Sequence, residues 1–116
     1  MKPVGPYTPI RQAGDLYFVS GQIGIEPDTG ELVDGFAAQA QQVMNNLAAV
    51  LSEADLSVKD IVKTTIYLKD IKDYDQMNQI YHEDMNGNAP ARAAFAVADL
   101  PKGALIEIEA IAHKNA

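Results

Sequence analysis

The sequence predicts an α+β fold in which two helices cover one face of a β-sheet. Residues 36–54 repeat apolar side chains at the i, i+3, i+4, i+7 spacing of an amphipathic helix. Residues 61–68, IVKTTIYL, alternate and are rich in β-branched side chains, which is typical of a strand. Along the whole chain the elements follow the order β-β-α-β-α-β-β. This order indicates an α+β sandwich rather than a doubly wound sheet.

The amino-terminal part predicts a hairpin followed by a helix. Gly14 and Asp15 supply a turn, and the stretch LYFVS after it reads as a strand. Turn residues recur in PDTG at 27–30, and again at Asp34 and Gly35, before the helix over 36–54. The apolar stripe of that helix contains Ala40, Val43, Met44, Leu47, Val50, Leu51 and Ala54.

The second half of the chain predicts one helix among three strands. Ser57 and Asp60 have the spacing of a one-turn capping box before an expected central strand at 61–68. Asp70 can cap a helix over 71–85. The expected closing elements are strands at 92–98 and 105–112, separated by a turn at 101–103.

Composition and charge limit the class of protein. The 116 residues are 47% hydrophobic and 22% charged, which predicts a single globular domain over residues 1–116. The net charge of −7 disfavours nucleic acid and anionic membranes as partners. No cysteine is present, so disulfides and thiolate chemistry are excluded. Neither a signal peptide nor a membrane span is apparent, and we expect a cytoplasmic protein.

Arg92 stands at the head of an alanine-rich strand within PARAAFAVADL, residues 90–100. Arginine keeps its charge, so a buried arginine needs a carboxylate partner, from the protein or from a ligand. We expect the apolar side chains of the last two strands to face the helices, namely Phe95, Val97, Ile106 and Ile108.

If these two strands pair, Arg92 shares the opposite face with Glu107 and Glu109. That face is otherwise small and alanine-rich, which predicts that a second copy of the chain covers it, with a polar pocket at the contact. Periodicity leaves two interpretations of Arg92 open. In the first, it forms a structural ion pair with one of the glutamates. In the second, it binds a ligand carboxylate through two parallel N–H donors of its planar guanidinium, which lysine cannot supply.

Several stretches carry a family resemblance over essentially the whole chain. They are VGPY at 4–7, SGQIGIEPDTGEL at 20–32, DIVKTTIYLKDI at 60–71, and PAR at 90–92 followed by LPKGALIEIEAIA at 100–112. In this order they resemble the RidA (YjgF, L-PSP) family of reactive-intermediate deaminases. The resemblance implies a chorismate-mutase-like fold with a mixed sheet, assembled as a homotrimer around a central barrel, with clefts between subunits.

The resemblance also implies an activity and its residues. Family members hydrolyse 2-imino acids, or enamine tautomers such as 2-aminoacrylate, to 2-keto acids and ammonia without a metal or organic cofactor. By this resemblance Arg92 binds the substrate carboxylate together with the backbone amide of Ala94, and Glu107 positions the attacking water. The other implied pocket residues are Gly21 near the reacting nitrogen, Ser20 and Asn78 in the lining, and Tyr7 over the mouth. Ala94 stands where the family often has cysteine, and only four residues precede GPY.

The leading functional hypothesis is therefore a cofactor-independent 2-iminobutanoate/2-iminopropanoate deaminase. An imine carbon beside a carboxylate is already electrophilic, so a held substrate, an oriented water and a proton donor suffice. The alternative is a non-catalytic, regulatory binder of 2-keto acids or other small carboxylates. An endoribonuclease, the activity in the family's older name, fits poorly with a charge of −7.

Other polar side chains predict no further site. His82 lacks a second histidine at the HExxH position, where Asn86 stands. Asp73 and Asp75 start like a calcium loop but lack its glycine. We expect Glu109 to be a solvated or interface charge rather than a second catalytic group, and His113 to be exposed; no metal site is predicted.

Overall fold

The computed structural model describes residues 5–114; residues 1–4, which include Val4 of the VGPY stretch, and 115–116 lie outside the described part. Its elements in chain order are β1 (Ile10–Ala13), β2 (Leu16–Ile23), α1 (Phe36–Ser52), β3 (Ile61–Leu68), α2 (Tyr74–Asp84), β4 (Ala91–Ala96) and β5 (Ile106–His113). Short 3-10 turns precede β3, α2 and β5 at Val58–Asp60, Ile71–Asp73 and Pro101–Gly103. The predicted element order is confirmed.

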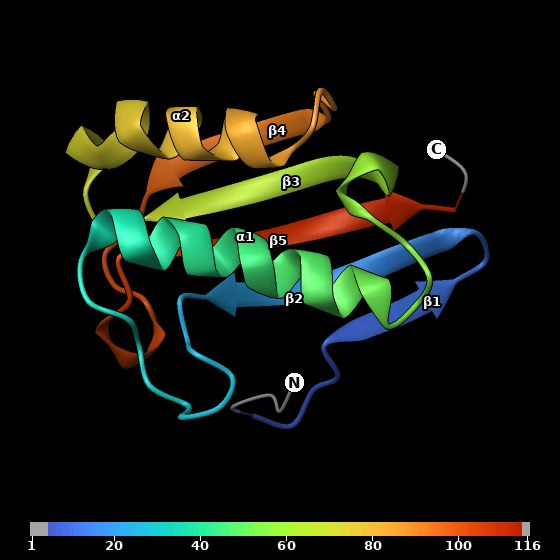
Figure 1. The fold of residues 1–116 in the computed structure, drawn as a ribbon, viewed down its shortest axis with the longest axis horizontal. Coiled ribbons are helices and arrows are strands. Elements are labelled where there is room, and N and C mark those ends of the chain that lie inside the picture. Colours follow the sequence, from blue (N-terminus) through green and yellow to red (C-terminus); the bar gives the residue numbers. More distant parts are fainter. Residues whose placement is uncertain (1–4, 115–116) are drawn as a thin grey trace.

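The sheet is five-stranded, and both helices lie on one of its faces (Figure 1). Its strand order is β1-β2-β5-β3-β4. All neighbouring strands run antiparallel except β3 and β4, which are parallel because the α2 crossover joins them. The mixed α+β fold with helices on one face is therefore confirmed.

One predicted pairing is wrong. The last two strands do not pair, because β3 lies between β4 and β5. β4 therefore forms one edge of the sheet and β1 forms the other. The expected central strand at 61–68 is an interior strand with two neighbours, as predicted.

The core lies between the sheet and the two helices. The predicted stripe of α1 is confirmed: Val43, Leu47, Val50 and Leu51 are fully buried. They pack in one cluster with the helix-facing side chains of β3 and β5, among them Ile66, Ile106 and Ile108. The predicted capping box is present, with Asp60 accepting a bond from the Ser57 amide at 2.9 Å. Asp70 accepts from the Lys72 amide at 3.0 Å, as expected of a cap.

The end of β2 is fixed closely against α1. A Cβ on Gly24 would lie 2.8 Å from Gln39 Cα, so only glycine allows this approach. The buried Asn46 donates to the Ile23 and Ile25 carbonyls at 3.1 and 2.9 Å. These contacts hold the neighbouring segment of β2, which contains Ser20 and Gly21, in a defined position.

The register places Arg92 and Glu107 on opposite faces of the sheet. Arg92 pairs with Thr64, which is buried under the helices. Glu107 and Phe95 both pair with Tyr67, and these three side chains face away from the helices. The expectation that Phe95 faces the helices while Arg92 lies beside Glu107 and Glu109 is therefore wrong.

The physical reason lies in α2. Two tyrosines of this helix offer ring faces and a hydroxyl to the Arg92 guanidinium. The small Ala94 packs against the core on the same face. The phenyl ring of Phe95 instead meets Tyr67 edge-on at 5.4 Å on the uncovered face. Strand alternation correctly separates Arg92 and Ala94 from Phe95. Hydrophobicity alone, however, predicts the wrong face of the sheet for each of these two sets.

Candidate active site

Arg92 is held by aromatic side chains rather than by a carboxylate. Its Nη2 donates to the Tyr74 hydroxyl at 3.0 Å. Its guanidinium carbon lies 5.7 Å from the ring centroid of Tyr74 and 5.2 Å from that of Tyr81, within the range of cation–π attraction. Within residues 5–114, no carboxylate forms an ion pair with Arg92. The first interpretation of Arg92, a structural ion pair with Glu107 or Glu109 in the same chain, is therefore wrong.

A pocket of about 330 Å³ adjoins the guanidinium. Besides Arg92 it is lined by Asn78, Tyr81, His82, Asn88, Ala89 and Pro90. The Oδ1 atom of Asn78 is buried and accepts no hydrogen bond from the described residues. An unmet buried acceptor is costly unless something pairs with it. The Arg92 pocket thus combines an unneutralised cation with an unmet acceptor.

The Ala94 amide lies at the open edge of the sheet. Val97, two residues beyond Phe95, donates its backbone N–H to Leu68 O at 2.9 Å. Because alternate amides of a strand point the same way, the amides of Ala93 and Phe95 also point toward β3. The Ala94 N–H then points away from β3, where β4 has no neighbour. It is a backbone donor two residues from Arg92.

Glu107 belongs to a second pocket, of about 350 Å³, on the uncovered face. This pocket is lined by Tyr7, Ser20, Gly21, Ile23, Pro101 and Glu107. The Glu107 carboxyl group lies directly against the backbone of Gly21: a Cβ there would lie 2.8 Å from Glu107 Cδ. The absence of a side chain at position 21 therefore makes room for this carboxyl group.

The pKa of Glu107 is raised above its ordinary value. The first cause is burial, which disfavours the charged form, and the second is the neighbouring charge of Glu109. Glu109 itself accepts a hydrogen bond from the Tyr67 hydroxyl at 2.9 Å. A carboxyl group whose pKa is moved toward neutrality is suited to exchange protons with a water or an amine.

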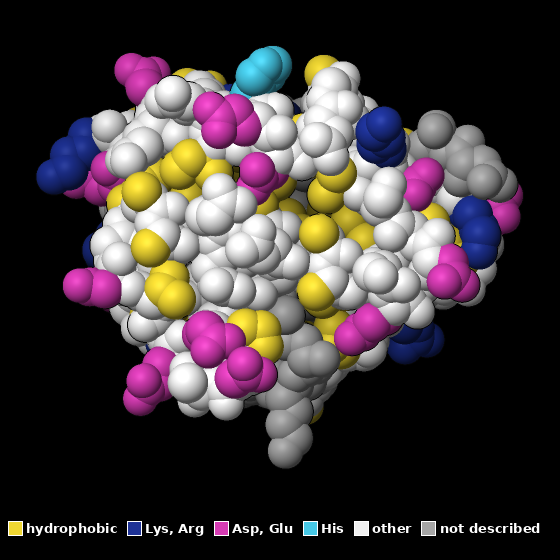
Figure 2. Space-filling model, in the orientation of Figure 1, with side chains coloured by type: hydrophobic (Ala, Val, Ile, Leu, Met, Phe, Trp, Pro, Cys, Tyr) yellow, Lys and Arg dark blue, Asp and Glu magenta, His cyan; other side chains and the backbone are white. Residues whose placement is uncertain are grey.

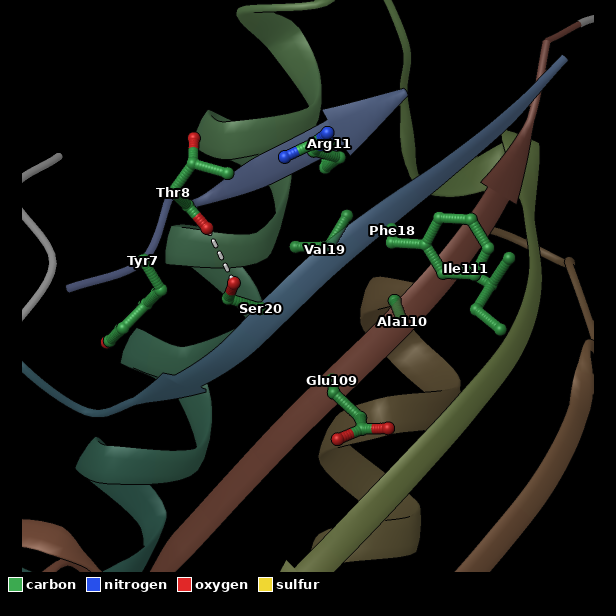
Figure 3. A pocket seen from close by; sticks show the side chains of 9 residues that line it. All are labelled: Tyr7, Thr8, Arg11, Phe18, Val19, Ser20, Glu109, Ala110 and Ile111. Carbon is green, nitrogen blue, oxygen red and sulfur yellow. Dashed lines mark hydrogen bonds between the residues drawn. The ribbon is translucent and has the colours of Figure 1, made fainter. Parts of the chain in front are cut away.

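The chain segment before β1 closes one side of the Glu107 pocket. The Ser20 hydroxyl donates to the Thr8 carbonyl at 2.6 Å, and the Ser20 amide donates to the Pro9 carbonyl at 2.9 Å. Figure 3 shows this link beside Tyr7, which projects from the same segment. Ser20 thus anchors the segment that carries Tyr7 over the pocket.

A third pocket, of about 380 Å³, continues along the uncovered face from Tyr7 and Ser20. In Figure 3 Phe18 of β2 lies beside Ile111 of β5, with Glu109 farther along β5. Phe18 and Phe95 remain 42% and 45% exposed on this face. Large apolar side chains are thus exposed on the face that the chain's own helices leave uncovered.

The predicted site residues therefore form two groups. Tyr7, Ser20, Gly21 and Glu107 lie together on the uncovered face, while Arg92 and Asn78 share the pocket beside α2 and the Ala94 amide lies at the adjacent edge. One chain does not bring the two groups together. No cluster of three or more histidine, cysteine or acidic side chains suited to a metal occurs among the described residues.

Sequence reasoning missed several residues that line these pockets or contact Arg92, among them Tyr74, Tyr81, Ile23 and Pro101. Tyr74 and Tyr81 of the second helix were not named as site residues, yet both contact Arg92. Their spacing with Asn78, at i, i+4 and i+7, is the signal that one helix face carries all three. Ile23 and Pro101 beside Glu107 had no local signal, because only the folded chain places them there.

The surface chemistry agrees with the overall charge. Acidic side chains outnumber basic ones across the helix-bearing face (Figure 2). No helix in the described part of the chain has the length and apolar character needed to cross a bilayer.

Comparisons with known proteins cover nearly the whole chain. The model of the family described as Endoribonuclease L-PSP matches residues 1–114. A RutC family protein of Pyrococcus abyssi is 48% identical, covering 98% of this chain and 91% of the relative. The human 2-iminobutanoate/2-iminopropanoate deaminase is 44% identical, covering 94% of this chain and 80% of the relative.

Solved structures agree with the sequence comparison. The structure of TdcF from E. coli with bound serine superposes with a TM-score of 0.90 at 37% identity, covering 96% of this chain and 90% of that chain. The fold, the family model and the relatives all indicate the same family. The chain therefore belongs to the RidA (YjgF, L-PSP) family.

Proposed function

We propose that this protein hydrolyses 2-imino acids to 2-keto acids and ammonia, in a site shared between two copies of the chain. The observation that carries the proposal is the arrangement of Arg92, a cation beside a pocket with no carboxylate partner in the described chain. The 44% identity to a human 2-iminobutanoate/2-iminopropanoate deaminase supports the reaction class.

Substrate binding is the proposed role of Arg92. Its planar fork can donate two parallel hydrogen bonds to a carboxylate, and the open-edge amide of Ala94 can add a third. The structure of the similar E. coli TdcF contains bound serine, a small molecule that carries a carboxylate. The Asn78 Oδ1 atom, unmet in the described chain, offers an acceptor on the same side.

Water activation is the proposed role of Glu107. Its carboxylate takes a proton from water as the oxygen attacks the carbon of the C=N bond. The electron pair of the C=N bond passes to nitrogen, which takes that proton back from Glu107 to give the neutral carbinolamine. The carboxylate then transfers the hydroxyl proton of the carbinolamine to nitrogen as the C–N bond breaks, which releases ammonia and leaves the C=O of the keto acid. Burial raises the pKa of Glu107, which suits both transfers. Ser20 and Gly21 would line this side, with Tyr7 above it.

A second copy is required because Arg92 and Glu107 face opposite sides of one sheet. The uncovered face presents Phe18, Phe95 and Ile111 around Glu109, a surface suited to contact with another copy. The family resemblance suggests a homotrimer in which the sheets line a central barrel. In such an assembly the Glu107 pocket of one copy would meet the Arg92 pocket of its neighbour.

A subunit-mixing experiment tests the shared site. Arg92→Ala and Glu107→Ala are each expected to be inactive as pure proteins. In assemblies formed from equal amounts of the two variants, random mixing restores about a quarter of the sites, since a site draws on two chains. Pure variants refolded separately and then combined without mixing of subunits are the control. No recovery after confirmed subunit mixing would contradict the shared site.

The activity itself is tested with 2-iminobutanoate and 2-aminoacrylate generated enzymatically in the assay. Wild-type protein should speed the release of ammonia and 2-keto acid above the buffer rate. A buffer-level rate combined with binding of 2-oxobutanoate would instead support the non-catalytic binder. Ribonuclease activity is not expected, because a net charge of −7 repels a phosphate backbone.

A further inference from the structure

Three polar side chains of α2 form a stripe over Arg92. Tyr74, Asn78 and Tyr81 are spaced at i, i+4 and i+7, so they lie on one face of the helix. Both tyrosine rings contact the guanidinium, at 5.7 and 5.2 Å from its carbon. Asn78 and Tyr81 line the pocket that Arg92 also lines. The arginine thus lies under a surface that belongs to its own chain.

The two tyrosines use their hydroxyl groups differently. The Tyr81 side chain is buried, and its hydroxyl is paired with that of Thr64 at 2.8 Å, which ties α2 to β3. Tyr74 is half-buried, and Arg92 is the partner that its hydroxyl has among the described residues. The Tyr81 hydroxyl therefore contributes to the fold, whereas the Tyr74 hydroxyl acts on the arginine.

We infer that Tyr74 is a positioning residue that orients the Arg92 fork for the ligand carboxylate; the inference rests on the proposed function. An arginine side chain has many rotamers, and a ligand that must immobilise it loses affinity. The bond from Nη2 to the Tyr74 hydroxyl, together with the ring contact, fixes the plane of the guanidinium before the ligand arrives. It uses one of the five donors and leaves the others for the carboxylate.

The neutral phenol is important for this role. A carboxylate at the position of Tyr74 would also orient Arg92, but it would occupy the fork and neutralise its charge. The Tyr74 hydroxyl accepts a hydrogen bond without adding a negative charge. The arginine is then ordered and still fully able to bind an anion.

The experiment removes only the hydroxyl, with Tyr74→Phe, which keeps the ring and its cation–π contact. We expect KM for the imine, and Kd for 2-oxobutanoate, to rise about three- to tenfold, as for loss of one hydrogen bond to a charged group. The turnover number should stay within about twofold, because Glu107 and the water are untouched. The melting temperature should be unchanged. Gln76→Ala, an exposed change on the same helix, is the control and should alter none of these values.

A double-mutant cycle separates positioning from a general effect on the helix. In an Arg92→Lys background the fork is gone, so adding Tyr74→Phe should change the Kd for 2-oxobutanoate by less than about twofold. If Tyr74→Phe changed the Kd equally in the wild-type and Arg92→Lys backgrounds, the inference would be overturned. It would also be overturned if the wild-type enzyme were active and Tyr74→Phe left KM unchanged. In either case the proposed function would stand. A wild-type protein that neither hydrolyses imines nor binds 2-oxobutanoate would overturn both.

Discussion

The two faces of the sheet hold their charged groups in different ways. On the helix-covered face, Arg92 is surrounded by side chains of its own chain, with two aromatic rings and a hydroxyl fixing the guanidinium. On the uncovered face, Glu107 lies over the bare backbone of Gly21, beside another carboxylate and open to whatever covers that face. The surrounding side chains order Arg92, whereas the absence of a side chain at Gly21 makes room for Glu107.

This difference suggests a division of labour. A pre-ordered cation reduces the cost of binding a small anion. A carboxyl group with a raised pKa is suited to proton transfer, but it needs water held against it and a partner surface to exclude the bulk. Under the proposed function the Arg92 side therefore supplies affinity and the Glu107 side supplies chemistry.

The largest effects should come from exchanging each of these two groups. Glu107→Gln should lower kcat about 10²- to 10⁴-fold, as for loss of a general base, with little change in the Kd for 2-oxobutanoate. Arg92→Ala should abolish detectable binding of 2-oxobutanoate. It should reduce kcat/KM by at least as large a factor as Glu107→Gln reduces kcat. Calorimetry for binding and ammonia release for turnover provide the two readouts.

Thermal melting provides the control for this pair. Breaking a buried ion pair would cost about 3–5 kcal/mol, but Arg92 has no such pair in the described chain. Arg92→Ala should therefore lower the free energy of unfolding by only about 1 kcal/mol, through loss of its aromatic contacts.

A Glu107→Gln protein that loses binding of 2-oxobutanoate while keeping its turnover number would contradict the division of roles between the Arg92 side and the Glu107 side.

How far the sequence predicts this arrangement can be judged from β4 and β5. In β5 the alternation correctly separates Ile106 and Ile108 from Glu107, because buried isoleucines can only face the core. In β4 the same rule separates Arg92 from Phe95 but does not say which face is which. That choice depends on α2, whose tyrosines contact the arginine, and on Tyr67, whose ring meets Phe95 edge-on at the uncovered face.

Strand order is the other feature that local pattern cannot provide. The hairpin at Gly14, the stripe of α1 and the capping box at Ser57 are encoded within a few residues, and all three are confirmed. The position of β3 between β4 and β5 depends on the crossover through α2, which no short stretch records. The site residues were named through resemblance, but their separation onto two faces became visible only in the folded chain.

A smaller effect should follow from adding one methyl group on the Glu107 side. In Gly21→Ala the new Cβ would meet the Glu107 carboxyl group, a flexible group that can move aside. We expect kcat to fall about 10- to 100-fold from this displacement, since misplacing a catalytic group by an ångström is costly. The Kd for 2-oxobutanoate and the melting temperature should change little. Enzyme kinetics and thermal melting measure both.

Gly24→Ala is the matched control for that methyl group. Its Cβ would meet the backbone of α1 at Gln39, which cannot move aside without shifting the helix. It should therefore lower the free energy of unfolding by about 1–3 kcal/mol, with a smaller effect on kcat per folded enzyme. If the two alanine variants behaved alike, the close contact between Gly21 and Glu107 would have no specific role.

The smallest effect concerns the pH at which Glu107 becomes active. Attack of water requires the carboxylate form of Glu107. Because the pKa of Glu107 is raised above the ordinary value of 4.5, the carboxylate form predominates only at a correspondingly higher pH. As pH falls through that raised pKa, kcat/KM should decline. Glu109→Gln removes the neighbouring charge, the second cause of the shift, while its amide oxygen can still accept from Tyr67.

The acid limb of kcat/KM should therefore move to lower pH in Glu109→Gln, but only part of the way, because burial remains the larger cause. Rates of ammonia release are compared across pH after subtraction of the buffer-catalysed rate. No equivalent change is expected in the Kd for 2-oxobutanoate, since Arg92 lies on the other face of the sheet from Glu109. A limb that stayed in place, or moved to higher pH, would show that Glu109 does not raise the pKa of the group that limits activity.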